Sequence, residues 1–192
     1  MEVVQYPHPA LRFKSKPITQ IDANLRSTID EMFDLMYAHR GIGLAANQVA
    51  LPWRVFIINP TGDSDNKDDE FVFINPKVSE HKGSEEAEEG CLSLPNVYGD
   101  VRRPEKIVVQ AIGMDGKGFA MELEDLPARV VQHETDHLDG VMFFDRMTET
   151  SARELQPKLD DFSTLFRKQQ ESGKIGSDEE LAAELDRLAA QM

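Results

Sequence analysis

Cysteine is almost absent from the 192-residue sequence. The single thiol, Cys91, cannot form a disulfide within the chain, so the fold depends on its core alone. No apolar run approaches the roughly 20 residues that a membrane-spanning helix needs. The start, MEVVQYPHPALRF, has no basic segment followed by an apolar one, and it is not rich in Arg or Ser. We therefore expect no signal peptide, a transit peptide that is either absent or already removed, no membrane association, and a cytoplasmic location.

Positive charge is also scarce. Lys and Arg number 21 against 35 Asp and Glu, which gives a net charge of −14. Such a surface repels phosphate backbones, so direct nucleic-acid binding is not expected. The most acidic run, Asp63–Glu70, is interpreted as a solvated loop between two strands. The hydrophobic share of 40% and the length suit one globular domain with a sizeable core.

Local patterns predict a mixture of helices and strands. Apolar residues at helical spacing predict an amphipathic helix over Asp22–His39, with Asp22 as a plausible N-cap. The β-branched and aromatic stretches Arg54–Asn59 and Phe71–Asn75 predict strands. Glu105–Glu124 is typical of a hairpin that turns near Asp115 and Gly116. A second helix is expected from about Asp125 or Pro127 to Leu138, ending at Gly140. Runs of strands with a few separate helices favour an α+β fold.

The C-terminal part is predicted to be helical. Ser151–Gln170 should form a helix that breaks or kinks near Pro157, followed by a flexible SGKIGS link. A last helix begins with a capping box, Ser177 with Glu180, and carries a narrow stripe of leucines. We therefore divide the chain into a domain over residues 1–150 and a helical extension over 151–192.

The stretch VVQHETDHLDG contains the pattern His-Glu-x-x-His. Residues four apart lie on one face of a helix, so His133 and His137 can hold one metal ion, and Glu134 can reach a water on it. The alternative is a pair of ordinary helical histidines, because the pattern also arises by chance.

Two histidines need a third ligand. Phe143 stands where one class of HExxH protease has a histidine, and Glu149 and Glu154 are candidates for a class that uses glutamate. Cys91, beside Gly90, is the remaining donor. A thiolate with two imidazoles leaves a fourth position open, which is the catalytic arrangement. No spacing rule connects Cys91 to the helix. The other histidines have no ligand-like neighbours and are interpreted as surface or structural residues: His8, His39 and His81.

Three segments, GIGLAANQ, EGCLS and QHETDHLDG, resemble in order and content the signature motifs of peptide deformylases. The opening YPHPALR also resembles the start of that family, so the resemblance extends to about Asp145. It implies removal of the formyl group from the N-terminal formyl-methionine of nascent polypeptides. It implies ferrous iron as the metal, with zinc or nickel able to substitute, and residues 1–150 as the catalytic domain. It also implies antiparallel strands packed around a central helix that carries the HExxH pattern.

The resemblance assigns roles within the three motifs. The implied metal ligands are Cys91, His133 and His137, and the implied general base and acid is Glu134. The side-chain amide of Gln48 and the backbone N–H of Leu92 are expected to donate to the formyl oxygen. The residues expected around the substrate are Gly41, Ile42, Gly43, Gly90 and Val130. Three further residues are candidates to orient the ligating histidines, namely Glu89, Asp136 and Arg103, and Asp136 is the strongest because it adjoins a ligand.

The C-terminal segment departs from relatives that dock on ribosomes through a basic helix. Residues 151–192 hold six basic and nine acidic side chains, so docking on ribosomal RNA is not supported. This segment could pack on the domain, and its leucine stripe favours a partner face. Two rival functions remain open, an HExxH endopeptidase with Glu or His as third ligand, and a non-catalytic relative that binds only peptide or metal.

Overall fold

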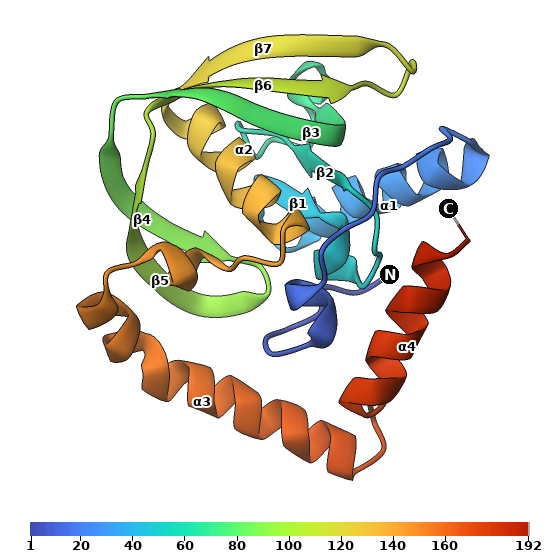
Figure 1. The fold of residues 1–192 in the computed structure, drawn as a ribbon, viewed down its shortest axis with the longest axis vertical. Helices are drawn as coiled ribbons and strands as arrows, with labels where there is room; N and C mark the ends of the chain where they lie inside the picture. Colours follow the sequence, from blue (N-terminus) through green and yellow to red (C-terminus); the bar gives the residue numbers. More distant parts are fainter. Residues whose placement is uncertain (192) are drawn as a thin grey trace.

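A computed structural model describes residues 1–191, and within them seven strands form two antiparallel sheets around α2 (Figure 1). The larger sheet has the order β1-β2-β3-β6-β7, and the smaller one pairs β4 with β5. The strands are β1 (Gly43–Ala45), β2 (Val55–Ile58), β3 (Phe71–Lys82), β4 (Glu85–Cys91), β5 (Leu94–Arg103), β6 (Lys106–Ile112) and β7 (Gly118–Glu124). The α-helices are α1 (Ala23–Ala38), α2 (Asp125–Leu138), α3 (Glu149–Glu171) and α4 (Asp178–Ala189).

Helix α2 occupies the centre of the fold. It contacts every strand of the five-stranded sheet, and the β4–β5 hairpin lies on its other side (Figure 1). Ala128, Val131 and Leu138 are buried against Phe56 and Phe73, whose rings stack at 4.8 Å. The predicted α+β fold, with antiparallel strands around a central helix, is confirmed.

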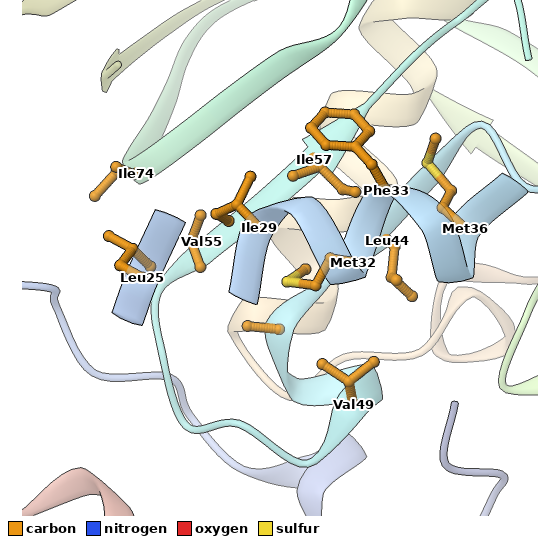
Figure 2. Close-up of a cluster of buried hydrophobic side chains, with 11 residues drawn as sticks. Leu25, Ile29, Met32, Phe33, Met36, Leu44, Val49, Val55, Ile57 and Ile74 are labelled. Carbon is orange, nitrogen blue, oxygen red and sulfur yellow. The ribbon is translucent and has the colours of Figure 1, made fainter. Parts of the chain in front are cut away.

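Helix α1 closes the opposite face of the sheet. Its Asp22 cap accepts the Leu25 N–H at 2.8 Å, as the sequence predicted. Figure 2 shows its apolar face packed against strand residues, and each large side chain buried there stabilises the fold by about 1.5–3 kcal/mol. The labelled residues of this cluster are Leu25, Ile29, Met32, Phe33, Met36, Leu44, Val49, Val55, Ile57 and Ile74.

The hairpin prediction for Glu105–Glu124 is confirmed. Strands β6 and β7 pair from Lys106 with Glu124 to Ile112 with Gly118, and Gly116 adopts φ +78° in the turn. The acidic run Asp63–Glu70 does lie between β2 and β3. The β4–β5 hairpin was not predicted from the sequence.

The C-terminal helices correct one prediction. Helix α3 runs without interruption from Glu149 to Glu171, so of the break or kink predicted near Pro157 the break is wrong. Pro157 is exposed, whereas Leu155 and Leu159 on either side of it are buried in a cluster with β5. These two anchors hold the helix together across the missing N–H, which costs about 3 kcal/mol in a helix interior.

Helix α4 turns back onto the N-terminal segment, where it contacts the short 3-10 turn η1 (Pro9–Arg12). Leu185 is only 2% exposed, and Phe166 lies edge-on against the His8 ring at 6.1 Å. The predicted capping box is present, because Ser177 and Glu180 exchange two hydrogen bonds. The buried leucine therefore packs on this chain's own domain and not on an open partner face. Among residues 1–191, none of the helices combines the length and apolar character needed to cross a membrane.

Candidate active site

A cavity of about 550 Å³ opens between α2, the β4–β5 hairpin and the segment that leads into β1. Its lining joins residues that are up to 95 positions apart in the sequence, from His39 to Glu134. The site residues expected from the sequence that line it are Gly41, Ile42, Gly43, Gln48, Glu89, Gly90, Cys91, Leu92, Val130, His133 and Glu134. The other three, Arg103, Asp136 and His137, are buried and are not part of the lining.

Three potential metal ligands meet beside this cavity. One donor atom each from Cys91, His133 and His137 lies within 4.8 Å of the other two. The Cys91 Sγ is 3.3 Å from the His137 Nε2, and the two histidine Nε2 atoms are 3.2 Å apart. The other candidate ligands, Glu149 and Glu154, are exposed on α3 and take no part in this cluster.

The spacing of these donor atoms suits a metal ion. Two nitrogens bound tetrahedrally at about 2.0–2.1 Å are separated by roughly 3.3 Å, close to the value found here. A thiol with two imidazoles is a donor set that soft and borderline divalent cations prefer. A buried Cys-His-His group with this geometry could therefore hold a metal ion.

Glu89, on β4, is the carboxylate that contacts a candidate ligand. Its Oε2 lies 2.9 Å from the His133 Nδ1, and Arg103 donates to both of its oxygens at 2.6 and 2.9 Å. Burial by itself would raise the pKa of Glu89, but hydrogen bonds from His133 and Arg103 outweigh it and lower the pKa to about 2. Glu89 is therefore a carboxylate throughout the neutral range.

Asp136 lies one step farther from the donor cluster. It accepts hydrogen bonds from Arg103 at 2.8 Å and from Arg146 at 2.6 and 3.1 Å. Contrary to the ranking made from the sequence, Glu89 and not Asp136 contacts a histidine of the pair. Within residues 1–191 the hydrogen-bond partners of its side chain are Arg103 and Arg146, and Arg103 connects it to Glu89.

Glu134 lies against β1. Its Oε2 is buried and has no hydrogen-bond partner among residues 1–191, which is the state expected of a group that faces a water or substrate. A Cβ added at Gly43 would come within 2.5 Å of the Glu134 Oε1, so any larger residue there would displace the Glu134 side chain. Burial raises the pKa of Glu134 to about 7, and a carboxyl group with that pKa can both accept and donate a proton near neutral pH.

The Gln48 side chain is fixed in one orientation. Its Oε1 accepts the Ala45 N–H at 2.9 Å, which turns the NH₂ group toward the Cys91 Sγ and the Ser93 Oγ, each 3.4 Å away. Gln48 is 1% exposed, so the amide has few alternative partners. Its N–H groups therefore point into the region between the first motif and Cys91.

Strand β1 supplies an open edge beside the donor cluster. Within the described part of the chain it pairs only with β2, at one end of the sheet order. The neighbouring residues Gly41 and Ile42 line the cavity together with Val130 and the Leu92 segment. An extended peptide could hydrogen-bond to such an edge and place a side chain on the apolar lining.

The sequence analysis did not predict that three further residues lie near the site. Arg129 donates to Glu89 at 2.8 Å, Arg146 donates to Asp136, and Asn47 donates to the His137 backbone oxygen. Only Arg129 carried a usable signal, because it lies four residues before His133 and so shares its helix face. The partners of the other two are set by tertiary packing alone.

Known proteins resemble this chain over most of its length. A family model for polypeptide deformylase matches residues 1–153. A peptide deformylase of Rhodopirellula baltica is 46% identical over 182 residues, which cover 95% of this chain and 90% of that protein. The chloroplastic peptide deformylase 1B of Solanum lycopersicum is 46% identical over 160 residues, covering 83% of this chain and 57% of the relative.

Solved structures agree with the sequence relatives. The crystal structure of Arabidopsis thaliana peptide deformylase 1B in complex with an inhibitor is 41% identical with a TM-score of 0.83, and the match covers 92% of this chain and 96% of that one. A Plasmodium falciparum peptide deformylase is 35% identical with a TM-score of 0.84, covering 86% and 97%. On the family match, the sequence identity and the shared fold, this chain belongs to the peptide deformylase family.

Proposed function

We propose that this chain removes the formyl group from the N-terminal formyl-methionine of nascent polypeptides by a metal-dependent hydrolysis. Membership of the family implies the deformylation itself. The metal dependence rests on one observation, the convergence of the Cys91 thiol and the His133 and His137 imidazoles beside the cavity. We propose ferrous iron as the native ion because the resemblance to peptide deformylases implies it, with zinc or nickel as substitutes, since a thiolate and two imidazoles accept all three.

The proposed chemistry assigns a task to each buried polar group. When bound, a divalent cation would act as a Lewis acid that activates water for attack on the formyl carbon. Glu134 takes a proton from the attacking water and passes it to the departing amine, a role worth about 10²–10⁴-fold in rate. The Gln48 amide and the Leu92 N–H donate to the formyl oxygen as it gains negative charge, and one such donor contributes about 10²–10³-fold.

Substrate binding is proposed to use the open edge of β1. The peptide would pair with the backbone of Gly41 and Gly43, while the methionine side chain packs on Ile42, Val130 and the stem of His133. On the opposite side of the cavity, Gly90 leaves room for the Tyr98 ring, because a Cβ at residue 90 would lie 2.7 Å from that ring. A formyl group has only hydrogen on its carbonyl carbon, whereas an acetyl group adds a methyl carbon that the proposed site would exclude by steric clash.

Turnover of formyl-Met-Ala-Ser, compared with its acetylated form, tests the proposal directly. We expect hydrolysis of the formyl peptide only, and a loss of about 10²–10⁴-fold in kcat for Glu134→Gln. Glu122→Gln, an exposed carboxylate on β7, is the matched control and should keep wild-type activity. A wild-type enzyme that cleaves internal peptide bonds, or that leaves the formyl peptide intact, would refute the proposed function.

The metal site has its own measurement. Elemental analysis of purified protein should give about one ion per chain for the wild type, and much less for Cys91→Ala. Retention of a full ion by Cys91→Ala would favour the endopeptidase alternative, with another third ligand.

We propose that the protein is located in the cytoplasm. Curated relatives include chloroplast and mitochondrial proteins of plants, so cell fractionation is the deciding measurement. Ribosomal RNA is not among the proposed partners, because residues 151–192 carry more acidic than basic side chains. Cosedimentation of the protein with ribosomes in low salt would contradict that part of the proposal.

A further inference from the structure

Arg129 connects the central helix to both strands of the β4–β5 hairpin. It lies on α2 and is 8% exposed. Its Nη1 donates to the Glu89 Oε1 at 2.8 Å and to the Val101 backbone oxygen at 2.9 Å, and its Nη2 donates to the Glu85 backbone oxygen at 3.1 Å. These contacts tie one side chain of α2 to two residues of β4 and one of β5.

The contact with Glu89 closes a short ring of interactions. Arg129 and His133 are one helical turn apart on the same face of α2. Arg129 binds one carboxylate oxygen of Glu89, and His133 lies 2.9 Å from the other. Arg103 reaches the same carboxylate from β5, so Glu89 is held from two directions. Arg103 already binds both oxygens of Glu89 from β5, and Arg129 adds the donor that joins this carboxylate to α2, the helix that carries His133.

The ring also joins the two parts of the donor set. The histidines His133 and His137 belong to α2, whereas Cys91 belongs to β4, two residues after Glu89. A side chain that fixes Glu89 relative to α2 therefore fixes the distance between the thiol and the imidazoles. Carboxylates that hydrogen-bond a ligating histidine orient its ring, and their loss weakens metal binding about 10- to 100-fold.

We propose that Arg129 is a positioning residue for the metal centre. It holds Glu89 in contact with His133 and so keeps the Cys91 thiol and the two imidazoles at the distances that bind the ion. This inference rests on the proposed function, because it takes Cys91, His133 and His137 as the ligands. It adds a residue outside the three motifs, whose removal should loosen the ion without touching any group that reacts.

The test measures release of Zn²⁺ from zinc-loaded full-length protein to a chromogenic chelator, well below the unfolding temperature of each variant. Arg129→Met should release Zn²⁺ about 10- to 100-fold faster than the wild type. Arg129→Lys keeps the charge but cannot serve Glu89, Val101 and Glu85 together, so its rate should lie between the two. If Arg129→Met does not fold, Arg129→Lys carries the comparison, and a wild-type rate in it overturns the proposal.

Arg102→Met is the matched control. Arg102 neighbours Arg103 on β5 but pairs with Glu86 at the surface, where both side chains are largely exposed. Its loss should leave Zn²⁺ release unchanged. A residue that only stabilised the fold would lower Tm in Arg129→Met without changing the release rate from the folded protein, which would overturn the proposed role.

A double variant tests the route through Glu89. If Arg129 acts by holding that carboxylate, Glu89→Gln with Arg129→Met should release Zn²⁺ no faster than Glu89→Gln alone. Rates that multiply would overturn this route. A wild-type chain that holds no Zn²⁺ would instead refute the proposed metal site itself, and the inference with it, so the two failures are distinguishable.

Discussion

Gly43→Ala should disable the proposed enzyme without removing any functional group. The new Cβ would lie 2.5 Å from the Glu134 Oε1 and 3.0 Å from its Cγ and Cδ. An ordinary carbon–oxygen contact is about 3.4 Å, so the carboxylate must move by roughly 0.9 Å, and the strand cannot give way because Gly43 pairs with Ile58. A displacement of about 1 Å at a catalytic group costs roughly 10²-fold in rate. We therefore expect kcat to fall about 100-fold.

The assay is steady-state hydrolysis of formyl-Met-Ala-Ser, with Tm and bound metal measured on the same preparations. Gly118→Ala is the matched control, since this strand glycine has no neighbour nearer than 4.0 Å to the added Cβ. It should keep wild-type kcat. Gly43→Ala with kcat within about threefold of wild type would refute the placement of Glu134 as the proton-transfer group, whereas loss of metal in that variant would locate the damage at the ligands.

Two further predictions concern the C-terminal extension and the N-terminal turn that it covers. Leu185→Ala should lower the free energy of unfolding by at least about 2 kcal/mol and Tm by roughly 4–8 °C. Leu165→Ala, at a site 50% exposed, should lower Tm by less than about 2 °C. Equal Tm shifts in the two variants would contradict the packing of α4. Burial lowers the pKa of His8 below its usual 6.5, although Asp178 partly raises it, so the unfolded chain takes up a proton that the folded chain excludes. The stability that neutral His8 contributes is present above about pH 6.5 and is lost as the pH falls. In His8→Asn, whose side-chain oxygen can still accept the Ala10 N–H, Tm should therefore fall less between pH 7 and pH 5 than it does in the wild type. An equal fall of Tm with pH in the two proteins would refute this.

Sequence patterns predicted the elements whose conformation is determined by residues close together in the sequence. The apolar spacing on α1 and the Asp115-Gly116 turn between β6 and β7 each contain the signal within a few residues. Strand β4 does not. Its sequence, EEAEEGC, is poor in strand-forming residues, and it pairs because Arg103 and Arg129 neutralise the one glutamate that faces inward. Such compensation arises only after distant segments meet.

The same distinction applies to the site. The helical period placed His133, Glu134 and His137 on adjoining faces of one helix, because i and i+4 spacing is local. Cys91 lies on another element, and no spacing rule connected it to that helix; only the elimination of other ligands and the resemblance did. Pro157 is the opposite case: a local rule predicted a break or a kink, and α3 continues through this residue with Leu155 and Leu159 buried on either side of it.

The arginines around Glu89 determine what the motif histidines can do. Because Arg103 helps to keep Glu89 ionised, that carboxylate can only accept a hydrogen bond, so the Nδ1 of His133 must donate one. Burial by itself would lower the pKa of His133, but hydrogen bonds with Cys91 and Glu89 outweigh it and raise the pKa to about 10, so the metal-free ring carries a proton on each nitrogen near neutral pH. Once the Nε2 proton leaves, a ring that still donates through Nδ1 has its lone pair on Nε2, the atom 3.2 Å from the His137 Nε2. A His-x-x-x-His pair on any exposed helix lacks this constraint and can adopt either tautomer. The buried charges thus give a common sequence pattern a preferred set of donor atoms, and a chain with net charge −14 buries two arginines beside its two candidate metal-ligand histidines.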